Sequence, residues 1–173
     1  MALSLGLGGE VLRLGLGLVA LLAAVHKLVQ RSRTQGAAID LIGLGRHAGA
    51  AGWTLALVAE LGGAALLLTG REVLAGAALL AGLWLAYAAA VAAAALHGGV
   101  RDCGCSFGQR HVPPVFAVAR NLLLAGLAGL TAFDGRGEAA PLLFSLPAAI
   151  VFLCLYLAAD AVGSITLNDR SRA

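Results

Sequence analysis

The feature of the sequence that most restricts its fold is a series of five apolar runs, each near the length that crosses a bilayer. A helix needs about 20 predominantly apolar residues to span a hydrocarbon layer of about 30 Å. With 60% hydrophobic and only 12% charged residues, the chain has more apolar surface than a soluble core of 173 residues could hide. We therefore predict an all-α integral membrane protein. One membrane domain covers 1–173, with about five transmembrane helices at 3–29, 50–69, 73–96, 114–133 and 141–162.

Other parts of the chain complete this outline. The run 3–29 lacks the basic leader and the cleavage site of a signal peptide, so we expect a retained first helix. The apolar patch at 37–44 is too short to cross a bilayer and is predicted to lie along its surface. An excess of Ala, Leu and Gly favours closely packed membrane helices, because small side chains let backbones approach.

The charged residues indicate topology rather than a nucleic-acid surface. The net charge is only +3, and most cations lie between the apolar runs. Eight Lys and Arg fall in the connections 27–46 and 101–110 and in the tail, whereas the other side has Arg71 and Arg136. The positive-inside rule then places the connection 97–113 in the cytoplasm of a multi-pass cell-membrane protein.

Ionisable residues inside the apolar runs are the first candidate functional groups. Glu60 lies in the middle of its run, where a carboxylate is either protonated or paired with a cation such as Arg13 or Arg120. Either a structural polar link or a functional group would explain Glu60. Arg13 is three residues from Glu10, so the two could pair on one helical face.

Two further polar positions stand near the ends of runs. Lys27, at the end of the first run, is interpreted as an interfacial anchor whose ammonium reaches the headgroups. Arg120 and Asn121 lie in the fourth run, one to two turns from the connection 97–113.

That connection contains the most reactive chemistry in the chain, two thiols one residue apart. A disulfide between them would close a very small ring, which stores strain and makes the bond easier to reduce. Gly104, without a Cβ, lets the intervening backbone bend. The pair is therefore a candidate redox site. The stretch reads Arg101-Asp102-Cys103-Gly104-Cys105-Ser106-Phe107-Gly108.

The residues around the thiols would influence their reactivity. Arg101, His97 and His111 supply positive potential that favours thiolate, whereas Asp102 opposes them. Phe107 could shield the pair or contact a docking partner, and Gly108 keeps the stretch pliable.

The sequence leaves alternatives open for these cysteines. Cys103 and Cys105 could bind a soft metal with His97 or His111, although a second ligand pair of a closed zinc site is lacking. They could also be inert. Cys154, in the last run, is expected to pack as a small hydrophobe, or else to act as a resolving thiol reached from the cysteine connection.

Together these residues resemble the MauE family, within the DoxX-like redox-associated membrane proteins. The resemblance extends over most of the chain, and its most specific part is the cysteine connection followed by Arg-Asn. Here Ser106 precedes Phe107, whereas the family pattern reads Cys-Gly-Cys-Phe-Gly. The matching positions are Arg13, Lys27, Glu60, the Asp-Cys-Gly-Cys stretch with Phe-Gly, and Arg120-Asn121.

The resemblance implies a membrane thiol-disulfide component that exchanges electrons with an extracytoplasmic thioredoxin-like protein, which would make it a thiol-disulfide oxidoreductase. Family members are associated with the redox maturation of methylamine dehydrogenase. An extracytoplasmic partner conflicts with the charge count, because disulfide chemistry belongs outside the cytoplasm. The side of the membrane that bears the cysteines is therefore left open.

The predicted mechanism is an exchange in which Cys103 or Cys105 forms a mixed disulfide and the other thiol resolves it. Arg120, Asn121, Glu60 and Arg13 would position the cysteine connection or relay a proton. Two other classes are a soft-metal binding or transport protein and a non-catalytic subunit of a larger membrane complex. The sequence has no recognisable nucleotide, haem or flavin motif, so no cofactor and no nucleic-acid partner is expected.

Overall fold

The computed structural model describes residues 2–43, 45–97, 113–134 and 142–170, and all regular secondary structure in these ranges is helical. Five of the helices, α1 and α3 to α6, are long and apolar enough to cross a membrane. The predicted all-α membrane bundle with five spans is thereby confirmed. The helices are α1 (Ala2–Val29), α2 (Arg31–Ile42), α3 (Arg46–Thr69), α4 (Val73–Leu96), α5 (Pro114–Asp134) and α6 (Leu142–Arg170).

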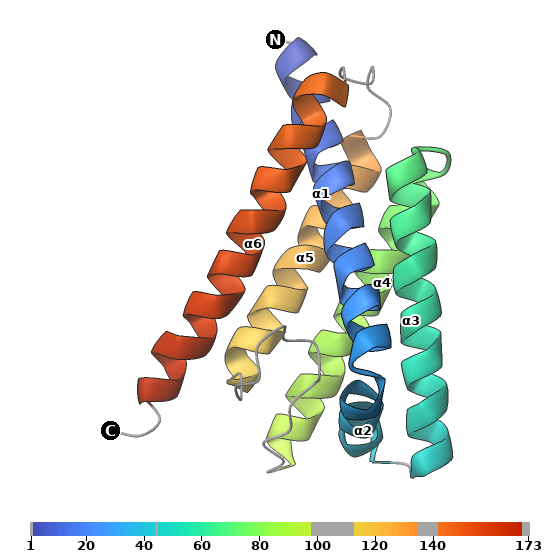
Figure 1. Cartoon of the computed structure of the whole chain (residues 1–173), viewed down its shortest axis with the longest axis vertical. Coiled ribbons are helices and arrows are strands. Elements are labelled where there is room, and N and C mark those ends of the chain that lie inside the picture. Colours follow the sequence, from blue (N-terminus) through green and yellow to red (C-terminus); the bar gives the residue numbers. More distant parts are fainter. Residues whose placement is uncertain (1, 44, 98–112, 135–141, 171–173) are drawn as a thin grey trace.

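The five long helices alternate in direction along the bundle (Figure 1). α1 begins at one end of the bundle, and α6 finishes at the other. α1 contacts each of the other helices, whereas the main packing partner of α6 is α1. The end of α4 and the start of α5, which flank the cysteine connection, lie at the same end of the bundle as α2.

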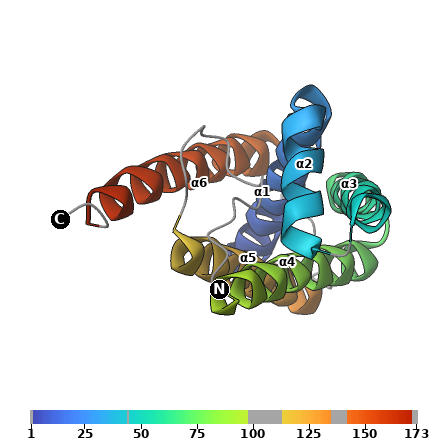
Figure 2. The ribbon, with the colours of Figure 1, turned by 90° about the horizontal axis from the view of Figure 1, so that it is seen from below.

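The short helix α2 does not run along the bundle. Figure 1 shows it end-on and Figure 2 shows it from the side, so it lies across the bundle axis. It begins at Arg31, well before the apolar patch 37–44, and closes at Gly43, whose φ of 68° favours glycine. Trp53 of α3 donates a hydrogen bond from Nε1 to Thr34 Oγ1 over 3.0 Å, which ties α2 to the bundle. The transverse orientation agrees with the prediction of a segment too short to span.

Glycine allows α3 and α4 to approach closely near the turn that joins them. A Cβ added to Gly63 would lie 2.5 Å from Leu80 Cγ, and one added to Gly76 would lie 2.9 Å from Leu66 Cβ. Leu80 is fully buried, so it has no space into which to move. These contacts are the kind that small residues permit between membrane helices.

The last helix is longer than the sequence predicted. The apolar run ends near residue 162, but α6 continues to Arg170. The hydropathy boundary marks where a helix leaves the lipid, whereas backbone hydrogen bonding continues in water as well. The segment 163–170, which follows the apolar run, is thus helical.

Candidate functional site

A buried polar cluster joins α1, α3 and α4. Glu60 Oε1 accepts hydrogen bonds from Lys27 Nζ over 2.5 Å and from the Tyr87 hydroxyl over 3.0 Å. The Lys27 Nζ also lies 5.2 Å from the centre of the Tyr87 ring, within range of a cation–π interaction. The side chains of Lys27 and Glu60 are only 7% and 1% exposed.

This cluster corrects two sequence interpretations. Lys27 is not an interfacial anchor, because its ammonium is buried against Glu60. Side chains on a helix lean toward its N-terminus, so a lysine near the end of α1 can reach back into the bundle. Of the two alternatives for Glu60, the structure shows the pair with a cation, but the partner is Lys27 rather than Arg13 or Arg120. Tyr87, a hydroxyl-bearing residue in an Ala-rich span, was not predicted to belong to this site.

The second oxygen of Glu60 has a different environment. Glu60 Oε2 is buried and makes no hydrogen bond within the part of the chain that the structure describes. Buried polar atoms are usually satisfied, so an unsatisfied carboxylate oxygen is a candidate contact for a ligand or a water molecule.

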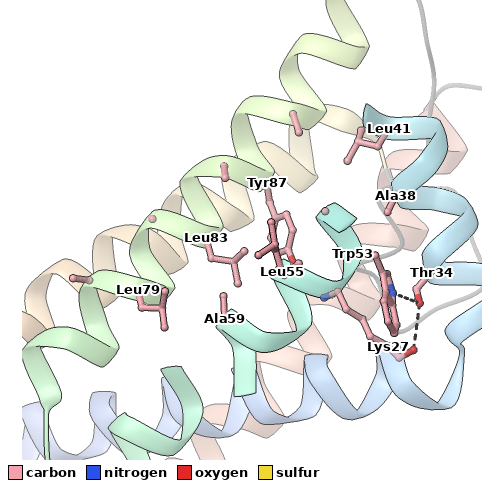
Figure 3. Close-up of a pocket in the computed structure, with 16 residues that line it drawn as sticks. Lys27, Thr34, Ala38, Leu41, Trp53, Leu55, Ala59, Leu79, Leu83 and Tyr87 are labelled. Atoms are coloured by element: carbon pink, nitrogen blue, oxygen red, sulfur yellow. Dashed lines mark hydrogen bonds between the residues drawn. The ribbon is translucent and has the colours of Figure 1, made fainter. Parts of the chain in front are cut away.

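A groove of about 560 Å³ lies beside this cluster, between α3 and α4, with α2 at one end (Figure 3). Among the described residues that line it, the polar ones are Lys27, Thr34, Trp53 and Tyr87. The lining residues Leu55 and Leu79 are 71% and 41% exposed and belong to membrane spans. The groove therefore opens toward the lipid. The remaining lining is Ala38, Leu41, Gly52, Ala56, Ala59, Ala78, Gly82, Leu83, Ala86 and Ala90.

Arg13 belongs to a separate contact near the other end of α3. Its guanidinium pairs with Glu10 over 2.5 Å, which confirms the predicted pair on one helical face. Arg13 Nη1 also donates to the backbone carbonyl of Leu67, so Arg13 links α1 to α3. Leu67 is seven residues from Glu60, about 10 Å along the helix at 1.5 Å per residue. Arg13 and Glu60 thus act in different places.

A second buried ion pair links α5 to α6. Arg120 Nη1 donates to Asp160 Oδ1 over 2.5 Å, and the two residues are 8% and 4% exposed. Both line a smaller cavity of about 310 Å³ between these helices. Asp160 was not among the predicted site residues, although an aspartate inside the apolar run 141–162 is a signal that could have identified it.

Asn121 follows Arg120 but does not share its contacts. Asn121 is 2% exposed, and its Nδ2 makes no hydrogen bond to any residue that the structure describes. Consecutive helical residues do not face the same neighbours. The Arg-Asn dipeptide therefore serves two separate environments rather than one.

The comparison with protein families decides where the chain belongs. The model of a family described as methylamine utilisation protein MauE matches residues 6–134, well over half of the chain. The chain belongs to the MauE family. It is therefore a multi-pass membrane protein of a family linked to methylamine utilisation. Searches of curated proteins and of solved structures each gave no match.

The MauE match contains four of the five spans and the cysteine connection, while α6 lies beyond it. Asp160 is thus supplied by a helix outside the matched range, although its partner Arg120 lies inside. The family match alone could not have revealed this pair.

Most of the predicted thiol site lies outside the described residues. His97, which follows α4 directly, is exposed, and Pro113 precedes α5. α4 and α5 pack along one another, so the two ends of the connection are held by neighbouring helices. The predicted site residues that lie outside the described ranges are Arg101, Asp102, Cys103, Gly104, Cys105, Phe107, Gly108 and His111.

Cys154 is the cysteine that the structure does describe. It is a free thiol and is exposed on α6, so the expectation that it packs in the interior is wrong. α6 packs mainly on α1, which covers one side of the helix and leaves much of the rest to face lipid. Within the described ranges, no group of three or more His, Cys, Asp or Glu could hold a metal ion.

Proposed function

We propose that this MauE-family protein exchanges electrons or disulfides with a thioredoxin-like partner through Cys103 and Cys105. The exchange would support the maturation of a disulfide-containing or cofactor-containing protein. The observation that carries the proposal is the Cys-Gly-Cys pair in the connection between α4 and α5, inside the matched family range. The packing of α4 on α5 supports it, because it fixes both helix ends that flank the pair.

The proposed chemistry is thiol–disulfide exchange. The thiolate of one cysteine attacks a sulfur of the partner's disulfide, and a mixed disulfide forms as the partner's S–S bond breaks. The second cysteine then attacks the mixed disulfide and releases the reduced partner. Two electrons pass from the dithiol to the partner, and the reverse sequence returns them.

Arg120 is proposed as a positioning residue for this chemistry. It lies six residues after Pro114, about 9 Å along α5 at 1.5 Å per residue. Its buried pair with Asp160 restrains the part of α5 nearest the cysteines. Asn121, buried in an environment of its own on the same helix, is proposed to hold this part of α5 by its packing, whereas the contacts of Glu60 and Arg13 assign them to helix–helix links farther along the bundle.

Trapping the mixed disulfide tests this function. Single variants Cys103→Ser and Cys105→Ser, in native membranes, remove one thiol each, and at least one should accumulate a reducible adduct with a thioredoxin-like protein. The double variant should form none while keeping its helicity and thermal midpoint. Cys154→Ser is the matched control and should behave as the native chain. If both folded single variants form no adduct and both native thiols stay free under all conditions, the proposal is wrong.

The same variants separate the other two classes. A soft-metal protein would bind copper(I) or zinc stoichiometrically and lose that binding when either cysteine is replaced. A non-catalytic subunit would support maturation undiminished with both cysteines replaced.

A further inference from the structure

The groove between α3 and α4 exists because these helices diverge. They are in close contact at Gly63 and Gly76, near their turn, and separate toward the end where α2 lies (Figure 1). Small residues line the widening space, among them Ala59 and Gly82. The result is an apolar groove that is open to lipid. Its polar groups are gathered at Lys27 and Tyr87, which form the polar end of the groove (Figure 3).

The polar end offers hydrogen-bond donors without a net charge. An ammonium has three donors, and the hydrogen bond of Lys27 to Glu60 uses one. Lys27 lines the groove, so its remaining donors are available to a ligand there. Glu60 balances the lysine charge and would repel an anion. These features favour a neutral head that accepts hydrogen bonds.

The depth of the polar end argues against a phospholipid headgroup. Glu60 is 14 residues from Arg46 and nine from Thr69, about 21 Å and 14 Å from the two ends of α3 at 1.5 Å per residue. Phosphates lie outside the hydrocarbon layer, whereas this cluster is well inside it. The rings of Trp53 and Tyr87 line the same groove and provide surfaces for a flat ring.

We infer that the α3–α4 groove binds a lipid-soluble quinone. A quinone carbonyl accepts a hydrogen bond from Lys27 Nζ, and the apolar tail leaves toward the lipid past Leu55 and Leu79. The volume of about 560 Å³ is within the range of small-molecule sites, roughly 300–1,000 Å³.

The choice of a quinone rests on the proposed function, because a membrane dithiol that cycles needs a second two-electron partner. A quinone that takes two electrons and two protons becomes a quinol, while Cys103 and Cys105 pass from dithiol to disulfide. The binding site itself consists of described residues of α1 to α4 and does not include the cysteines.

Tryptophan fluorescence can test the binding directly. The chain has two tryptophans: Trp53 lines the groove, whereas Trp84 is buried and is not part of its lining. The Trp84→Phe variant, in phosphatidylcholine nanodiscs, therefore reports on the groove alone. Decylubiquinone should quench Trp53 saturably. In Trp53→Phe, the remaining Trp84 should show only the gradual quenching that follows partition into the lipid.

A blocking variant makes the test specific. A Cβ at Gly82 would meet no atom within 4 Å, so Gly82→Leu can fill the groove without a backbone clash. In the Trp84→Phe background it should weaken decylubiquinone binding at least tenfold. Gly126→Leu, at an equally open position on α5 outside the groove, should leave binding unchanged. Lys27→Met should also weaken binding, but that variant breaks the Lys27–Glu60 ion pair as well. Gly82→Leu is therefore the decisive variant, because it leaves this ion pair intact.

The outcomes separate this inference from the proposed function. Quenching that never saturates, or that is equal in Gly82→Leu and Gly126→Leu, would show that lipid chains fill the groove and would overturn the quinone site. Cys103→Ser/Cys105→Ser should bind decylubiquinone as tightly as the native chain. Saturable binding without partner trapping would support the quinone site and reject the thiol exchange. Partner trapping without saturable binding would support the thiol exchange and reject the quinone site.

Discussion

Lys27 Nζ and Glu60 Oε1 lie 2.5 Å apart inside the bundle and join the last turn of α1 to the middle of α3. Both side chains are almost completely excluded from solvent. Removing one member of such a pair leaves an uncompensated buried charge, which is more costly than the loss of the pair as a unit. The stability of α1 against α3 therefore depends on both residues together.

Lys27→Met should lower the free energy of unfolding by about 3–5 kcal/mol, because Glu60 loses its cation. The double variant Lys27→Met/Glu60→Gln should lose less than the sum of the two single variants. SDS titration of helicity in mixed micelles measures each value. Arg71→Met, at an exposed position in the turn between α3 and α4, is the control and should change stability by less than about 0.5 kcal/mol. Strict additivity would contradict a direct pair.

Asp160→Asn should loosen α6, since Arg120 is then buried without its carboxylate. We expect a loss of about 3 kcal/mol or more, with a lower thermal midpoint. The exchanged pair Arg120→Asp/Asp160→Arg should recover part of this loss. If the exchanged pair is no more stable than Asp160→Asn, the ion pair is not what holds α5 to α6.

Gly63→Ala should destabilise the protein by about 1–3 kcal/mol, because the new methyl group would overlap the fully buried Leu80. Gly126→Ala adds the same methyl group where no atom lies within 4 Å, and should be neutral or slightly stabilising. The difference between the two thermal midpoints is the quantity to measure. Equal midpoints would mean that α3 and α4 separate without cost.

Cys154→Ala should change stability by less than about 0.5 kcal/mol, because the thiol is exposed on α6 rather than packed in the interior. In intact membranes Cys154 should react with a lipid-soluble maleimide and resist a membrane-impermeant one, since it lies in a span. The Cys103→Ser/Cys105→Ser background isolates its signal. Accumulation of a mixed disulfide with the partner in Cys154→Ala would instead identify Cys154 as the resolving thiol.

The sequence was sufficient for features that depend on neighbouring residues. The five spans follow from continuous apolar runs, and the predicted 73–96 agrees with α4 at both ends. The Glu10–Arg13 pair was predictable because residues three apart on a helix are neighbours whatever the fold. The spacing of Cys103 and Cys105 is likewise visible in the sequence, and their redox role stays a prediction.

The partners of Glu60 and Arg120 were not predictable in this way. Lys27 and Glu60 are 33 positions apart, and Arg120 and Asp160 are 40 apart. Which charges meet depends on the rotation, tilt and depth of each helix, and hydropathy gives none of these. The groove also escaped prediction, because it arises from the divergence of α3 and α4 rather than from any local pattern.

The sequence by itself determined that this chain crosses a membrane five times and bears a thiol pair between its third and fourth crossings. The free energy of transferring a helix into lipid is a sum of contributions from its own side chains, so the composition along the chain is enough to place the spans. The tertiary structure alone decided that Lys27 is an internal partner of Glu60, that Arg120 holds Asp160, and that Cys154 faces outward. These outcomes depend on contacts between helices, because a charge in lipid is stable only where the packing brings its counter-charge.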